Sequence, residues 1–200
     1  DLRMSRGLGD VYKRQDDTDA AERVKIQYGT SMCYPVSSMG SHVSVVPNHQ
    51  LNRKTPLHTR ANVAYFGTFG YELDLNKLSD EEISEVKQQI TFMKEYRELI
   101  QFGTFYRLKS PFEGNETVWM TVSEDKKTAL VFWYRERNVV NADFTRVRLQ
   151  GLDPDLIYRN EYNETENYGD ELMNLGLLTT DCTAGEPTSE DAPCTDYESR

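Results

Sequence analysis

The feature that most constrains the fold of this chain is a long amphipathic helix predicted at residues 79–103. Ser79 and Glu82 have the spacing of a capping box, in which each side chain accepts a hydrogen bond from the other residue's backbone N–H. Gly103 supplies an end, because glycine readily leaves the helical conformation. Apolar residues fall close to one stripe at Ile83, Val86, Ile90, Met93 and Ile100. A helix of this length with a single apolar stripe can cover one face of a sheet.

After this helix the apolar period changes from helical to extended. Residues 118–122 (VWMTV) and 128–135 (TALVFWYR) are rich in β-branched and aromatic side chains, and a polar turn separates them. This pattern predicts a β-hairpin. Residues 144–150 and 156–162 predict two further strands. Strands that follow helices in this way indicate a second, all-β unit that begins near residue 104.

The segment before residue 79 predicts shorter elements. Residues 19–29 predict a helix in which Asp19 and Glu22 provide the start and Gly29 the end. Residues 57–69 predict another helix. We interpret residues 1–15 as a non-native leader that resembles translated sequencing-adaptor sequence, so we exclude it from the fold.

Charge and cysteine content exclude several classes of protein. The net charge is −10, and residues 151–200 hold 13 acidic and 2 basic side chains, so no basic stripe is available for nucleic acid. No apolar run reaches the about 18 residues that a membrane span needs, so we expect no membrane segment. Cys33, Cys182 and Cys194 are an odd number without metal-type spacing, which favours a reducing cytoplasm. The sequence alone does not decide whether Cys182 and Cys194 form a disulfide in an oxidising compartment.

The chemistry-bearing residues leave two interpretations open. His42, His49 and His58 with Cys33 show neither a nucleophile signature nor metal-ligand spacing, and no phosphate-binding glycine motif occurs. The acidic run Asp16, Asp17 and Asp19 lies at a helix start, where backbone N–H groups favour negative charge. These carboxylates are either helix-start acids or part of a pair for proton transfer, as glycoside hydrolysis uses.

A family resemblance connects these motifs. The run DDTDAAERVKIQYGTSMCYPVSSMGSHVSVVPNHQ from Asp16 onward is followed by FGYELDL, ELIQFG, YRLKSPFEGN and GDELMN. In this order the motifs are similar to bacterial α-galactosidases of glycoside hydrolase family 36, over residues 16–176. The family's Trp-Thr-Ser before the first of these aspartates is missing here.

The resemblance implies a fold of class α/β plus all-β. Residues 16–103 would be the C-terminal part of a catalytic (β/α)8 TIM barrel, and residues 104–200 a truncated antiparallel β-sandwich with an acidic loop at 181–196. Within that sandwich we expect one sheet face to pack around Val118, Met120, Leu130, Phe132 and Leu149.

The resemblance also implies an activity. The family retains configuration with two aspartates, and Asp16 matches its general acid/base, which also contacts substrate. The Lys-Trp-Asp-type nucleophile motif is absent from these residues, so the chain alone is expected to be inactive. The substrates would be terminal α-galactosides such as melibiose and raffinose, with no metal or other cofactor and a homo-oligomeric full-length enzyme. The alternatives are a relative that transfers galactose to a sugar acceptor and a non-catalytic carbohydrate-binding β-module.

Overall fold

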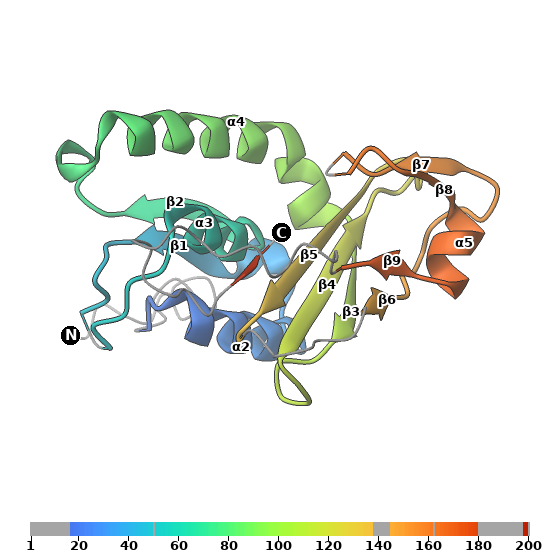
Figure 1. Cartoon of the computed structure of the whole chain (residues 1–200), viewed down its shortest axis with the longest axis horizontal. Coiled ribbons are helices and arrows are strands. Elements are labelled where there is room, and N and C mark those ends of the chain that lie inside the picture. Colours follow the sequence, from blue (N-terminus) through green and yellow to red (C-terminus); the bar gives the residue numbers. More distant parts are fainter. Residues whose placement is uncertain (1–16, 50, 138–144, 162, 180–197, 200) are drawn as a thin grey trace, which may run out of the picture. The chain divides into compact units, whose positions relative to one another are not determined.

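The computed structural model describes residues 17–49, 51–137, 145–161, 163–179 and 198–199. The chain divides into two compact units, residues 1–102 together with 199–200, and residues 103–198. Helices dominate the first unit and short strands the second, as Figure 1 shows. The leader 1–15 and the loop 181–196 lie outside the described residues. None of the described helices combines the length and the apolar character that crossing a membrane requires.

The described residues of the first unit form two parallel strands, two short 3-10 helices and three α-helices. Its elements are α2 (Ala20–Ser31), η1 (Val36–Ser38), β1 (Gly40–Ser44), α3 (Leu57–Tyr65), β2 (Thr68–Glu72), η2 (Leu75–Lys77) and α4 (Asp80–Phe102). β1 and β2 pair in parallel with Gly40 opposite Thr68 and Ser44 opposite Glu72. Parallel neighbours need a crossover connection, and α3 supplies it between them.

Two of the predicted helices end differently from the sequence pattern. α2 starts after Asp19 as predicted, but it continues past Gly29 to Ser31. The helix predicted at 57–69 stops at Tyr65, because Thr68–Glu72 pairs with β1. Gly67 lies between the two elements, and a Cβ there would come within 2.9 Å of the Met39 carbonyl oxygen. The strand pairing therefore overrides the local helical pattern.

The long helix α4 begins as the capping box predicted. Glu82 Oε2 accepts the backbone N–H of Ser79 at 2.9 Å, and Ser79 Oγ accepts the N–H of Glu82 at 3.2 Å. Within the predicted stripe, Val86, Met93 and Ile100 are buried. The phenol of Tyr71 on β2 donates to Gln89 Oε1 at 2.8 Å, so a buried amide of α4 is tied to the second strand.

The described residues after Phe102 form one four-stranded sheet, two small sheets and a short helix. The elements are β3 (Thr104–Lys109), β4 (Glu116–Val122), β5 (Ala129–Arg135), β6 (Arg146–Val147), β7 (Ile157–Arg159), β8 (Glu166–Tyr168), α5 (Gly169–Asn174), β9 (Leu177–Leu178) and β10 (Glu198–Ser199). The larger sheet has the order β10-β5-β4-β3, and β6-β9 and β7-β8 form the small sheets. The predicted hairpin is confirmed as the antiparallel pair β4 and β5. The strands expected at 144–150 and 156–162 are shorter, at two and three residues.

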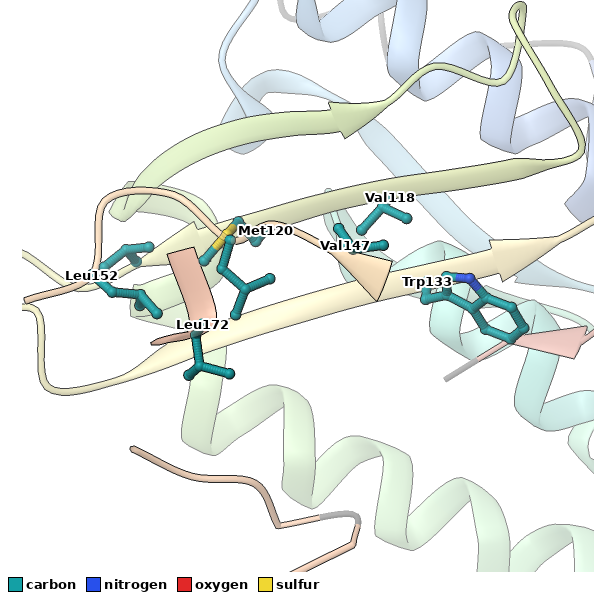
Figure 2. Packing of buried hydrophobic residues seen from close by; sticks show 8 residues of the cluster. Val118, Met120, Trp133, Val147, Leu152 and Leu172 are labelled. Carbon is teal, nitrogen blue, oxygen red and sulfur yellow. The ribbon is translucent and has the colours of Figure 1, made fainter. Parts of the chain in front are cut away.

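One face of the larger sheet packs against the segments that follow it. Figure 2 shows side chains from β4, β5, β6 and α5 converging on one cluster. Its buried members are Val118, Met120, Val122, Trp133, Val147, Leu149, Leu152 and Leu172. The prediction was right for Val118, Met120 and Leu149 but wrong for Leu130 and Phe132. Leu130 and Phe132 lie on the other face of the sheet. There the register sets Trp119 opposite Phe132, and the two rings stack with their centroids 4.4 Å apart.

Gly169 provides a test of this packing, because α5 begins against the backbone of the loop before β7. A Cβ at Gly169 would lie 1.9 Å from the carbonyl oxygen of Asp153, whereas a Cβ at Gly114 would meet nothing within 4 Å. We expect Gly169→Ala to lower the free energy of unfolding by about 3 kcal/mol or more. The control Gly114→Ala should change it by less than about 0.5 kcal/mol. The measurement is urea unfolding followed by tryptophan fluorescence, since both tryptophans, Trp119 and Trp133, lie in this unit. Equal midpoints for the two variants would contradict the close approach at Gly169.

Candidate functional site

The parallel pairing of β1 and β2 puts the carboxyl ends of both strands at one edge of their sheet. Ser44 ends β1, and its Oγ donates a 2.8 Å hydrogen bond to the carbonyl oxygen of Thr18, just before α2. The start of α2 therefore lies at this same edge. We call residues 17–19 the rim segment and residues 45–56, which follow β1, the rim loop. Ligand sites of α/β folds lie outside the carboxyl ends of their strands, so this edge is the candidate site.

Two buried arginines fix the ends of β1. Arg23 of α2 donates to the carbonyl oxygen of Gly40, and Arg60 of α3 donates to that of Ser44. Burial lowers the pKa of Arg23 to about 10, while the negative charge of Asp17 acts in the opposite direction. Burial also lowers the pKa of Arg60, and Glu82 and Glu85 oppose that shift. Both guanidinium groups stay charged at neutral pH, so each makes a charge-assisted bond that positions the strand.

Asp19 caps α2, as the sequence predicted. Its side chain is 1% exposed, and Oδ2 accepts the backbone N–H of Glu22 at 3.2 Å. The same oxygen accepts a hydrogen bond from Arg53 Nη1 at 2.5 Å. A buried carboxylate needs such compensation, because desolvation without a partner is costly. Asp19 is thus engaged by its own helix and by the rim loop.

The rim loop is organised around the buried side chain of Asn48. Its Nδ2 donates to Thr18 Oγ1 at 3.0 Å, and its Oδ1 accepts the backbone N–H of Leu51 at 2.9 Å. Its backbone N–H donates to the carbonyl oxygen of Arg53 at 2.8 Å. Asn48 therefore closes the turn that carries Arg53 and joins that turn to the rim segment.

Asp17 is half-buried, and its Oδ1 accepts the backbone N–H of Asp19 at 2.9 Å. This local bond closes the rim segment into an Asx-type turn. Asp16, the residue predicted to be the acid/base, lies outside the described residues. Its covalent neighbour Asp17 shows that the described rim segment adjoins it directly.

The remaining candidate residues are spread over the first unit. His42 on β1, His49 in the rim loop and His58 on α3 are all exposed, and Cys33 is an exposed free thiol. His42 lies against Gly70 on β2, where an added Cβ would be 2.7 Å from its Cδ2. Among the residues that the structure describes, no three His, Cys, Asp or Glu side chains gather as a metal site would require.

The sequence analysis missed Arg53, Asn48 and Thr18. Each lies in a polar segment without periodicity, so the local pattern carries no signal for it. A weak signal existed in Asp19, because a carboxylate followed by an apolar helix face requires a cation or several donors once it is buried. Which cation that is depends on a contact between residues that are 34 positions apart.

Two family models match this chain. Melibiase matches residues 8–103, and the glycosyl hydrolase family 36 C-terminal domain matches residues 116–200. Alpha-galactosidase AgaA of Geobacillus stearothermophilus is 54% identical over 162 residues. Alpha-galactosidase Mel36A of Lactobacillus acidophilus is 50% identical over 162 residues. Each alignment covers 81% of this chain, which spans 22% of the length of either relative.

The solved structures agree with this match. The crystal structure of a variant of AgaA from Geobacillus stearothermophilus in complex with raffinose matches with a TM-score of 0.83 and 47% identity. This match covers 93% of the present chain and 24% of that chain.

The role of Asn48 in the rim loop can be tested against its exposed neighbour His49. Asn48→Ala removes the side-chain bonds to Thr18 and Leu51 described above, so the backbone N–H of Leu51 and the hydroxyl of Thr18 lose these partners. We expect the free energy of unfolding to fall by about 1–3 kcal/mol. His49→Ala should change it by less than about 0.5 kcal/mol. Thermal unfolding followed by far-ultraviolet circular dichroism measures both. A His49→Ala effect as large as that of Asn48→Ala would contradict the assigned role.

Proposed function

The chain belongs to glycoside hydrolase family 36, and we propose that it is part of a retaining α-galactosidase that acts on melibiose- and raffinose-type oligosaccharides. The observation that carries this proposal is the 54% identity over 162 residues to an alpha-galactosidase. The raffinose complex of a structural relative supports the substrate class.

In this proposal residues 16–103 are the C-terminal part of a (β/α)8 barrel. The parallel β1 and β2 with their α3 crossover support it, because that is the repeating unit of such barrels. Residues 104–200 are then the β-sandwich domain. The antiparallel β3, β4 and β5, with the smaller β6-β9 sheet on the same apolar cluster, support the second assignment.

The proposed reaction needs two carboxyl groups about 5 Å apart. One carboxylate attacks the anomeric carbon while an acid protonates the departing sugar oxygen, so the glycosidic bond breaks and a galactosyl-enzyme forms. The acid, now ionised, removes a proton from water, which hydrolyses this intermediate and restores the starting configuration. We assign the acid/base role and a direct contact with substrate to Asp16. The nucleophile belongs to a part of the enzyme beyond these residues.

The described neighbours of Asp16 favour this choice among the three aspartates. Asp19 is buried and shares one oxygen between Glu22 and Arg53. Asp17 accepts the backbone N–H of Asp19. Both carboxylates therefore have structural partners, whereas a residue that alternates between acid and base must exchange protons with substrate and water.

The proposal also covers cofactors, cellular location and oligomeric state. Two carboxylates suffice for glycosyl transfer to water, so the proposed reaction needs no cofactor or metal. The exposed free thiol of Cys33 favours a reducing cytoplasm. We also propose that the full-length enzyme is a homo-oligomer.

Replacing Asp16 in the full-length enzyme tests the assignment. Asp16→Asn should reduce kcat/KM for raffinose by about 100- to 10,000-fold, because the sugar leaving group needs protonation. Formation of the galactosyl-enzyme from 2,4-dinitrophenyl α-galactoside should slow much less, because that leaving group departs unprotonated. Added azide should then raise turnover of the aryl substrate, since it attacks the intermediate without a base. Steady-state kinetics with both substrates measures these effects.

Asp17→Asn is the matched control, because its amide oxygen can still accept the backbone N–H of Asp19. This variant should hydrolyse raffinose within about tenfold of wild type, below the range of a lost general acid. If Asp17→Asn abolishes raffinose hydrolysis and Asp16→Asn does not, the acid/base has been assigned to the wrong carboxylate.

The 200-residue chain alone should be inactive, because the proposed nucleophile is not among its residues. We expect purified chain to release nitrophenol from an aryl α-galactoside no faster than buffer, as measured by absorbance. Turnover well above buffer would show that these residues contain both catalytic carboxylates.

A further inference from the structure

Three contacts between described residues tie the rim segment to β1 and the rim loop. Ser44 Oγ donates to the Thr18 carbonyl oxygen at 2.8 Å, and Asn48 Nδ2 donates to Thr18 Oγ1 at 3.0 Å. The third tie is the ion pair between Arg53 Nη1 and Asp19 Oδ2. Two of these contacts reach Thr18, and the ion pair with Arg53 reaches Asp19.

If Asp19 moves, Asp17 at the start of the rim segment moves with it. The Asp19 backbone N–H is bonded to Asp17 Oδ1, so the three residues form one closed turn. Asp17 is covalently joined to Asp16. Whatever fixes Asp19 therefore also restricts Asp17, the residue that follows the proposed acid/base in the sequence. Catalytic geometry is sensitive on this scale, because a misplacement of about 1 Å can cost about 100-fold in rate.

Arg53 is suited to this task. Its side chain is 30% exposed against 1% for Asp19, so the pair is shielded on the carboxylate side. Its backbone is held in turn by the Asn48 N–H. The planar guanidinium group of Arg53 presents its donors in a fixed geometry, so it orients the Asp19 carboxylate as well as balancing its charge. The flexible ammonium of a lysine would orient the carboxylate less well.

We propose that Arg53 is a positioning residue for the acid/base: by holding Asp19 it fixes the rim segment, which directly follows residue 16 in the chain. This inference rests on the proposed function, in which Asp16 donates the proton. Arg53 contacts no reacting atom in this account and acts through Asp19 and Asp17.

The leaving group separates positioning from a purely structural role. A displaced acid slows substrates that need protonation and spares those that do not, whereas loss of folded enzyme slows both equally. In the full-length enzyme, Arg53→Met should lower kcat/KM for raffinose by about 10- to 100-fold. The value for 2,4-dinitrophenyl α-galactoside should fall by less than about threefold, since no proton is needed at its leaving oxygen. Arg53→Lys should lower kcat/KM for raffinose by an intermediate factor, because lysine keeps the positive charge but lacks the planar guanidinium group.

Lys54→Met is the control, since Lys54 is the exposed neighbour of Arg53 in the same loop. It should leave both substrates within about twofold of wild type, as expected for a surface substitution. If Arg53→Met does not yield folded enzyme, Arg53→Lys carries the test by the same comparison of substrates. Equal losses on both substrates, or no loss on either, would overturn the positioning role.

Asp16→Asn, measured in parallel, distinguishes failure of this inference from failure of the proposed function. If Asp16→Asn shows the leaving-group dependence and the Arg53 variants do not, the positioning role is wrong and the proposed function stands. If Asp16→Asn lacks that dependence, the acid/base assignment itself fails, and the inference about Arg53 fails with it.

Discussion

The parallel pairing of β1 with β2 is the constraint on which the candidate site depends. Because the strands are parallel, both end at one edge, and the connection between them has to cross back over the sheet as α3. Buried arginines from α2 and α3 bind the carbonyl oxygens at the two ends of β1, so the strand is held against both helices. The start of α2 and the loop after β1 therefore meet at a defined place.

Buried charged side chains are the second constraint on this edge of the sheet. Asp19, Arg23 and Arg60 are all less than a tenth exposed, and each has a specific partner. Removing such a group from water is costly, and only well-directed hydrogen bonds offset the cost. This cost favours one arrangement of the rim over others, because a displaced loop would leave the Asp19 carboxylate without its cation. The same bonds that satisfy the buried charges thus define the geometry beside the proposed acid/base.

The second unit depends on strand register rather than on charge. In the pair β4 and β5, the sequence pattern correctly predicted two strands and a turn. It was wrong about the β5 residues that share a face with Val118 and Met120, for which it chose Leu130 and Phe132. Trp133 shares that face, and Phe132 does not, because the register places Trp133 opposite Val118. With apolar side chains on both faces of β5, alternation alone leaves the two assignments equally plausible, and a shift of one residue exchanges them.

The sequence by itself determined the features that are encoded locally. The capping box at Ser79 and Glu82, the cap at Asp19 and the hairpin all involve residues close together in the chain, and their backbone requirements are visible in the residue types. Ordered motifs such as MGSHVS and VPNHQ carried the family. The tertiary structure alone decided the partners of the buried groups: Arg53 for Asp19, Asn48 for Thr18 and the strand β2 in place of the end of a helix. These contacts join residues about thirty positions apart, and no local periodicity encodes them, because they form only when the parallel strands bring the two loops together.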